Sequence, residues 1–226
     1  MEAGFLRRVT RFLDRRRLKD PRWQRLFEED PSGEVVSVDC ETTGFDTKRD
    51  DVVSIAAIRV TRNRILTSSA FQALVRPEAA MRPDAIRVHQ LRAVDVAAGR
   101  PMAEVLPEFL DFVGGRPLLG YWIDFDVAML DRRVRDLYGF RLPNRRIEVS
   151  SLYYELKYRG APPGTRLDLS FAAIARDLGL RQLPLHDPFN DALSAAEMWV
   201  LLDAMKAAGH TIARDGSDDA SVGITH

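Results

Sequence analysis

Two carboxylates follow an apolar run in the segment VVSVDCETTGF, which spans residues 35–45. Asp39 and Glu41 are two residues apart, so on a strand both side chains project from the same face. Like charges held side by side at the edge of a core repel each other unless a proton or a cation lies between them. Hard oxygen ligands in this arrangement suit Mg²⁺ or Mn²⁺. By itself an Asp-x-Glu pair is also typical of a solvated strand end, so the metal-site hypothesis needs further ligands.

Two later segments supply such ligands. Asp126 lies in WIDFDVAML, within the first turn of an expected helix, and HDPFNDAL places His186 in a loop and Asp191 one turn into the next helix. Each residue also has a purely structural explanation, because the helix dipole favours an aspartate in a first turn and histidines are common in surface loops. Together they match two-metal phosphodiester cleavage, in which oxygen ligands hold two cations about 3.5–4 Å apart and a base deprotonates the attacking water.

The elements that must position these residues follow an α/β pattern. Runs rich in Val, Ile and Phe, separated by short polar turns, predict an antiparallel meander of three strands, at 35–39, 52–60 and 64–75. A short buried strand is expected at 117–122, and helical patterns occur at 99–115, 124–138, 168–178 and 188–206. Asp187 is the expected N-cap of the last helix. The order predicts a mixed sheet flanked by helices.

The two ends of the chain differ from this pattern. Residues 1–20 hold seven basic and three acidic side chains, with Phe5, Val9, Phe12 and Leu13 at helical spacing. Such a basic amphipathic helix either packs on the domain surface with its charges in water or binds phosphates or a partner. We expect an N-terminal extension at 1–32, the main domain at 33–206 and a polar, flexible tail at 207–226.

Composition excludes several classes of function. The charges of the 33 basic and 33 acidic residues cancel, so any binding of nucleic acid must depend on a local group of basic residues. Cys40 is the only cysteine, which excludes an intramolecular disulfide and a cysteine-based zinc site. Its side chain should point away from the Asp39 face, as a core thiol. No apolar run approaches the roughly 20 residues that cross a bilayer, and the N-terminus lacks a signal-peptide core, so we expect a cytoplasmic protein without membrane contact.

The motifs resemble those of the DEDDh branch of DnaQ-like 3′–5′ exonucleases, a family that includes proofreading subunits of bacterial DNA polymerases. The stretch of Asp39, Glu41, Thr42, Thr43 and Gly44 is similar to the first motif, DxETTG. Phe125 and Asp126 match the second motif, and His186 with Asp191 matches the third, HxxxxD. The resemblance covers residues 33–206 and implies a ribonuclease H-like fold, with an antiparallel meander plus parallel strands.

The resemblance also implies a role for each residue. Asp39, Asp191 and Glu41 would hold the cation that carries the attacking water, while Asp39 and Asp126 would hold the one near the leaving oxygen. His186 would be the general base, so activity should rise with pH as His186 loses its proton. The segment from Cys40 to Phe45 would receive the 3′-terminal nucleotide, with Phe45 against a base.

Two segments depart from the family pattern. The family has a His-Asn pair before the second-motif aspartate, whereas this chain has Tyr121 and Trp122, which either stack on bases or fill the core. Many members have a His-Gly-Ile turn where this chain has His89, Gln90 and Leu91. His89 is therefore a further candidate for lining the substrate site.

The implied function is removal of nucleoside 5′-monophosphates from single-stranded or frayed 3′ ends, with DNA as the favoured substrate. RNA or short oligoribonucleotides are the alternative substrate, since 2′-hydroxyl recognition depends on pocket shape. A non-catalytic nucleic-acid-binding module is the alternative from another class. The family also makes a DNA polymerase a possible partner, although the tail after residue 209 has no apolar anchor for one.

Overall fold

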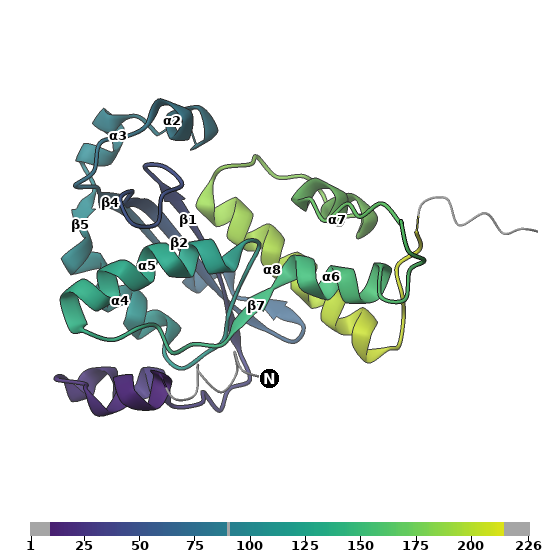
Figure 1. The fold of residues 1–226 in the computed structure, drawn as a ribbon, viewed down its shortest axis with the longest axis horizontal. Helices are drawn as coiled ribbons and strands as arrows, with labels where there is room; N and C mark the ends of the chain where they lie inside the picture. The colour runs from purple at the N-terminus through teal and green to yellow at the C-terminus, as the bar shows by residue number, and fades with distance from the viewer. Residues whose placement is uncertain (1–9, 90, 215–226) are drawn as a thin grey trace, which may run out of the picture.

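The computed structural model describes residues 10–89 and 91–214, and a mixed sheet of seven strands forms its centre (Figure 1). The strands are β1 (Val35–Thr42), β2 (Val52–Thr61), β3 (Arg64–Ile65), β4 (Phe71–Arg76), β5 (Arg100–Pro101), β6 (Leu118–Gly120) and β7 (Arg146–Glu148). Their order is β5-β4-β2-β1-β6-β7, and β3 also pairs with β2. Strands β1, β2 and β4 pair antiparallel, whereas β6 is parallel to β1 and β7 to β6. The predicted meander with parallel strands is confirmed.

Helices cover both faces of this sheet (Figure 1). They are α2 (Pro83–His89), α3 (Ala93–Ala97), α4 (Met102–Val113), α5 (Ile123–Tyr138), α6 (Val149–Lys157), α7 (Phe171–Asp177) and α8 (Pro188–Ala207), with 3-10 turns η1 (Pro21–Phe27) and η2 (Thr67–Ser69). Val36, Val38 and Cys40 of β1 pack in one core with α4 and α5. Val35 packs in a second core with α6 and α8, and the Ser37 hydroxyl donates to the Ala192 carbonyl of α8 at 2.7 Å. Because side chains alternate along β1, Asp39 and Glu41 lie on the α8 face and Cys40 on the α5 face, as predicted.

The N-terminal extension packs against the main core. Residues 10–16 are helical, and η1 buries Trp23, Leu26 and Phe27 beside α4 and α5. The Arg11 guanidinium donates to the Phe27 carbonyl at 2.7 Å, which ties the helix to η1. Phe5 and Val9, on which part of the helix prediction rested, lie outside the described residues. The domain boundaries at residues 32 and 206 stay predictions.

Several expected elements have different bounds. The strand predicted at 64–75 is interrupted by η2, where a run of Thr and Ser turns the chain, so that β3 and β4 pair separately with β2. The strand predicted at 117–122 ends at Gly120, because Trp122 adopts a left-handed conformation that starts α5. The helix predicted at 99–115 begins at Met102, after β5, and its C-cap is Gly114 as expected. The sequence patterns missed η1, α2, α3, β7 and α6 altogether.

Within the described part of the chain, each helix is too short or too polar to traverse a lipid bilayer.

Candidate active site

The four predicted carboxylates and His186 converge at one end of the sheet. Strand β1 carries Asp39 and Glu41, the first turn of α5 carries Asp126, and the first turn of α8 carries Asp191. The potential ligand atoms of Glu41, His186 and Asp191 all lie within 4.8 Å of one another. Burial raises the pKa of Asp39 well above its usual range, and the charges of Asp126, Asp191 and Glu41 raise it further. The five residues therefore surround one centre.

Backbone hydrogen bonds orient two of these carboxylates. The Cys40 N–H donates to Oδ1 of Asp126 at 3.1 Å, which ties the first turn of α5 to β1. The His186 N–H donates to Oδ2 of Asp191 at 2.9 Å. Asp187 caps α8 by accepting from the Asn190 N–H at 3.0 Å, as predicted. The start of α8 is thus held in a defined position beside β1.

Burial, together with crowding of negative charge, sets the electrostatics of this centre. Burial, followed by the charges of Asp191 and Asp187, raises the pKa of Glu41 to about 8. Burial also raises the pKa of Asp126, although the hydrogen bond from Cys40 opposes the shift. Burial raises the pKa of Asp191 against the bond from His186. A set of oxygen ligands that repel one another in this way, with an imidazole at its edge, fits a hard divalent cation.

His186 lies at the wall of a groove beside the cluster. Its φ is 63°, in the left-handed region that non-glycine residues rarely adopt and that is found at functional sites more often than elsewhere. The groove has a volume of about 320 Å³ and lies between the strands β2 and β4 and the start of α8 at Pro188 and Phe189. The exposed imidazole is therefore accessible from this groove.

The loop after β1 combines buried backbone with an exposed ring. Thr42, Thr43 and Gly44 are buried, whereas Phe45 is 66% exposed and its ring centroid lies 6.2 Å from that of Phe125. The Thr42 hydroxyl donates to the Gly44 carbonyl at 2.7 Å. The loop thus presents the exposed Phe45 ring beside Phe125.

Tyr121 and Trp122 have different environments. The Tyr121 hydroxyl donates to the Leu169 carbonyl at 3.2 Å, and its ring packs against Phe171 with centroids 5.3 Å apart. Trp122 stacks on Tyr121 at an interplanar angle of 15°, has a φ of 60° and is 66% exposed. Tyr121 therefore belongs to the core, and Trp122 presents an open ring surface at the start of α5.

His89 is the last residue of α2, and its side chain lies outside the described part of the structure, as does Gln90. Its assignment as a substrate-lining residue stays a prediction.

Glu148 is an acidic residue near the site that the sequence patterns missed. It ends β7 and accepts hydrogen bonds from the N–H groups of Ile123 and Ser150, both at 3.1 Å. Its charge contributes to the raised pKa of Asp126. No periodicity points to Glu148, because β7 spans only three residues with two charged side chains. It fixes the turn that starts α5.

Known proteins are similar to this chain in sequence and in fold. The exonuclease family matches residues 36–199. The chain belongs to the DnaQ-like 3′–5′ exonucleases. The DNA polymerase III subunit epsilon of Aquifex aeolicus is 30% identical to this exonuclease over 171 residues, which cover 74% of this chain and 79% of that protein. The Escherichia coli subunit epsilon is 25% identical over 177 residues, covering 74% and 70% of the two chains.

A solved structure shows the same fold. The zinc-bound complex of E. coli exonuclease I with single-stranded DNA matches the exonuclease with a TM-score of 0.67 at 17% identity. The match covers 78% of this chain and 41% of exonuclease I, so this chain spans less than half of that protein. The predicted ribonuclease H-like fold is confirmed.

Proposed function

We propose that this exonuclease removes nucleoside 5′-monophosphates one at a time from the 3′ ends of single-stranded or frayed DNA. The observation that carries the proposal is the convergence of Glu41, His186 and Asp191 within 4.8 Å at the strand that also holds Asp39. The names of the two epsilon subunits favour DNA over RNA as the substrate. They also favour a DNA polymerase as a protein partner.

The carboxylates would hold two divalent cations, Mg²⁺ or Mn²⁺. Asp39, Glu41 and Asp191 would hold one, and Asp39 with Asp126 the other. When bound, the pair would supply Lewis-acid activation of water and stabilise the charge that develops on the phosphate. The raised pKa values of Asp39 and Glu41 support this assignment, because a cation relieves the repulsion that causes part of these shifts.

The side chains of the exonuclease would then move the proton and place the substrate. His186 takes the proton of the water that attacks phosphorus. The P–O3′ bond breaks, which leaves a 3′-hydroxyl on the shortened strand and releases the nucleoside 5′-monophosphate. Thr42, Thr43 and Gly44 line the terminal nucleotide, with Cys40 contributing its main chain. Phe45, Phe125 and Trp122 offer rings for bases.

The decisive experiment follows 5′-labelled single-stranded DNA and RNA of one sequence, with Mg²⁺, with Mn²⁺ and with chelator. Asp191→Ala should lower the rate by at least about 10³-fold, because it removes a proposed metal ligand, while the far-UV spectrum stays unchanged. Asp203→Ala, at a half-buried position farther along the same helix, is the matched control and should keep wild-type activity.

A metal-dependent ladder of DNA products that Asp191→Ala abolishes supports the proposal. A faster ladder on RNA overturns the substrate preference, and no ladder on either strand overturns the activity in favour of a binding module.

A further inference from the structure

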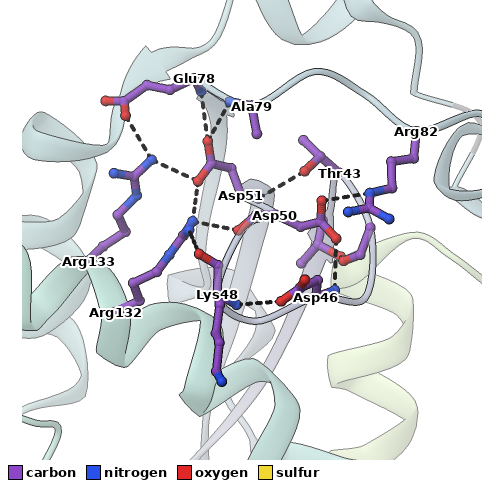
Figure 2. A network of polar contacts seen from close by, with 12 residues as sticks. Thr43, Asp46, Lys48, Asp50, Asp51, Glu78, Ala79, Arg82, Arg132 and Arg133 are labelled. Atoms are coloured by element: carbon purple, nitrogen blue, oxygen red, sulfur yellow. Dashed lines mark hydrogen bonds and ion pairs between the residues drawn. The ribbon is translucent and has the colours of Figure 1, made fainter.

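A network of polar contacts holds the loop that joins β1 to β2 (Figure 2). Two consecutive aspartates, Asp50 and Asp51, end this loop, and both side chains are at most 5% exposed. Figure 2 shows that their carboxylates point in different directions, Asp50 toward Arg82 and Asp51 toward Arg132 and Arg133. The two aspartates therefore hold different parts of the structure.

Asp51 attaches the loop to the body of the domain. Its Oδ2 accepts from the N–H groups of Glu78 and Ala79 at 2.9 and 2.7 Å, and its Oδ1 accepts from Arg132 and Arg133 of α5. Burial by itself would raise the pKa of Asp51, but these hydrogen bonds and arginine charges lower it. The ionised carboxylate thus joins β2, the segment after β4 and α5.

Thr43 depends on this attachment. Its N–H donates to the Asp51 carbonyl at 2.8 Å, and its hydroxyl accepts from the Asp51 N–H at 2.9 Å. Asp51 therefore fixes the first residues of the loop whether or not the Asp50 side chain is present.

Asp50 holds the next residues. Its Oδ2 accepts from the Asp46 N–H at 2.8 Å, and its Oδ1 accepts from Nε of Arg82 at 2.9 Å. The Arg82 N–H in turn donates to the Thr43 carbonyl at 3.0 Å. Asp50 and Arg82 therefore hold the loop at Thr43 and at Asp46, which precede and follow Gly44 and Phe45.

Gly44 lies directly against this pair. A Cβ built on Gly44 would lie 2.4 Å from Oδ2 of Asp50 and 2.6 Å from Cδ of Arg82, both far inside van der Waals contact. The absence of a side chain at Gly44 is therefore required by the packing of the loop itself.

We propose that Asp50, with Arg82, is a positioning residue for the 3′-terminal nucleotide. It acts through Gly44 and Phe45, which would line that nucleotide, and this inference rests on the proposed function. Loss of the Asp50 carboxylate leaves the Asp51 attachments in place, so the fold persists while the Gly44–Asp46 segment loosens. Asp50 variants should consequently affect the nucleoside part of the substrate and spare the chemistry at phosphorus.

Two chromogenic diesters separate these effects. The p-nitrophenyl ester of thymidine 5′-monophosphate and bis(p-nitrophenyl) phosphate release the same leaving group, but only the first carries a nucleoside. In Asp50→Asn, the side-chain NH₂ replaces one carboxylate oxygen. It then faces the N–H of Asp46 or of Arg82 and cannot accept from it. We expect kcat/KM for the thymidine ester to fall at least 10-fold, mainly through KM, with less than a twofold change for the other diester. Arg49→Ala, in the same loop and with its side chain 81% exposed, is the matched control and should leave both values unchanged.

Hydrogen exchange of the peptide that covers residues 43–50 gives a readout independent of activity. Exchange should be faster in Asp50→Asn than in wild type, with no change in the peptides of α5. The positioning role is overturned if kcat/KM falls equally for both diesters or falls for neither. It is also overturned if hydrogen exchange in this peptide is the same in Asp50→Asn and in wild type. Failure of the wild type to hydrolyse either diester or the labelled DNA would instead overturn the proposed function, and this inference with it.

Discussion

Burial and charge crowding at Glu41 together predict that Glu41→Gln stabilises the metal-free protein. The pKa of Glu41 is raised from 4.5 to about 8, so the folded state holds a proton that the unfolded state has already lost. Stability contributed by this proton is fully present below pH 4.5 and is lost as pH rises toward 8. Glutamine has nearly the same shape and carries no charge, so the variant avoids this loss.

The expected gain follows from linkage at about 1.4 kcal/mol per pH unit. The Gln variant should exceed wild type by on the order of 0.7 kcal/mol at pH 5 and 3 kcal/mol at pH 7, with a plateau near 5 kcal/mol above pH 8, given the pKa of about 8. With saturating Mn²⁺ the order should reverse, because ligand binding stabilises the native state and the variant lacks one proposed ligand.

Urea unfolding at pH 5, 6, 7 and 8, in chelator and in Mn²⁺, measures these differences. Exposed Glu29→Gln is the control and should follow wild type at every pH. A free-energy difference between wild type and Glu41→Gln that does not change with pH in chelator would refute the reasoning, since only a titrating Glu41 produces the slope.

Two further predictions concern exposed groups. Trp122→Gly should raise thermal stability, because a left-handed conformation costs a non-glycine residue about 1–2 kcal/mol. It should also weaken binding of single-stranded DNA about 5- to 100-fold through lost stacking. An unchanged affinity, measured by fluorescence anisotropy, would show that Trp122 does not contact the DNA. Replacing the exposed Arg15, Arg16 and Arg17 by Gln should reduce the slope of log affinity against log salt by about 2 if the N-terminal helix contacts phosphates; an unchanged slope would make the helix purely structural.

The sequence predicted the positions of the four carboxylates better than the bounds of the elements around them. Asp39, Glu41, Asp126 and Asp191 lie at the ends of long elements with clear apolar periods, so strand alternation and helix starts placed them correctly. Glu148 escaped prediction because its strand is short and polar, and its contact with Ile123 joins residues 25 positions apart. Local pattern carries no information about such pairings.

Asp50 and Asp51 escaped prediction for a different reason. Two adjacent aspartates before a strand are typical of a solvated turn, and the partners that bury them come from distant segments, Arg82 after β4 and Arg132 with Arg133 on α5. Only the tertiary fold shows that the acids are at most 5% exposed. That the segment from Cys40 to Phe45 receives the 3′-terminal nucleotide stays a prediction, beside the packing reason for a glycine at position 44 that the structure supplies.

Topology explains how a site with so much negative charge can form. Strands β1 and β6 are parallel, so α5, which starts just after β6, begins at the same sheet edge where β1 ends. The start of α8 is held to the other face of β1 by the bond from Ser37 to Ala192. Two helix N-termini therefore face the carboxylates from opposite faces of the sheet, and their partial positive charges favour anions there. This contribution is modest, about 0.3–1 kcal/mol for each exposed terminus, against the several kcal/mol by which burial, with the charges of Asp191 and Asp187, disfavours an ionised Glu41. The helix ends can orient the acids, and the metal ions of the proposed function would favour the ionised form of all four.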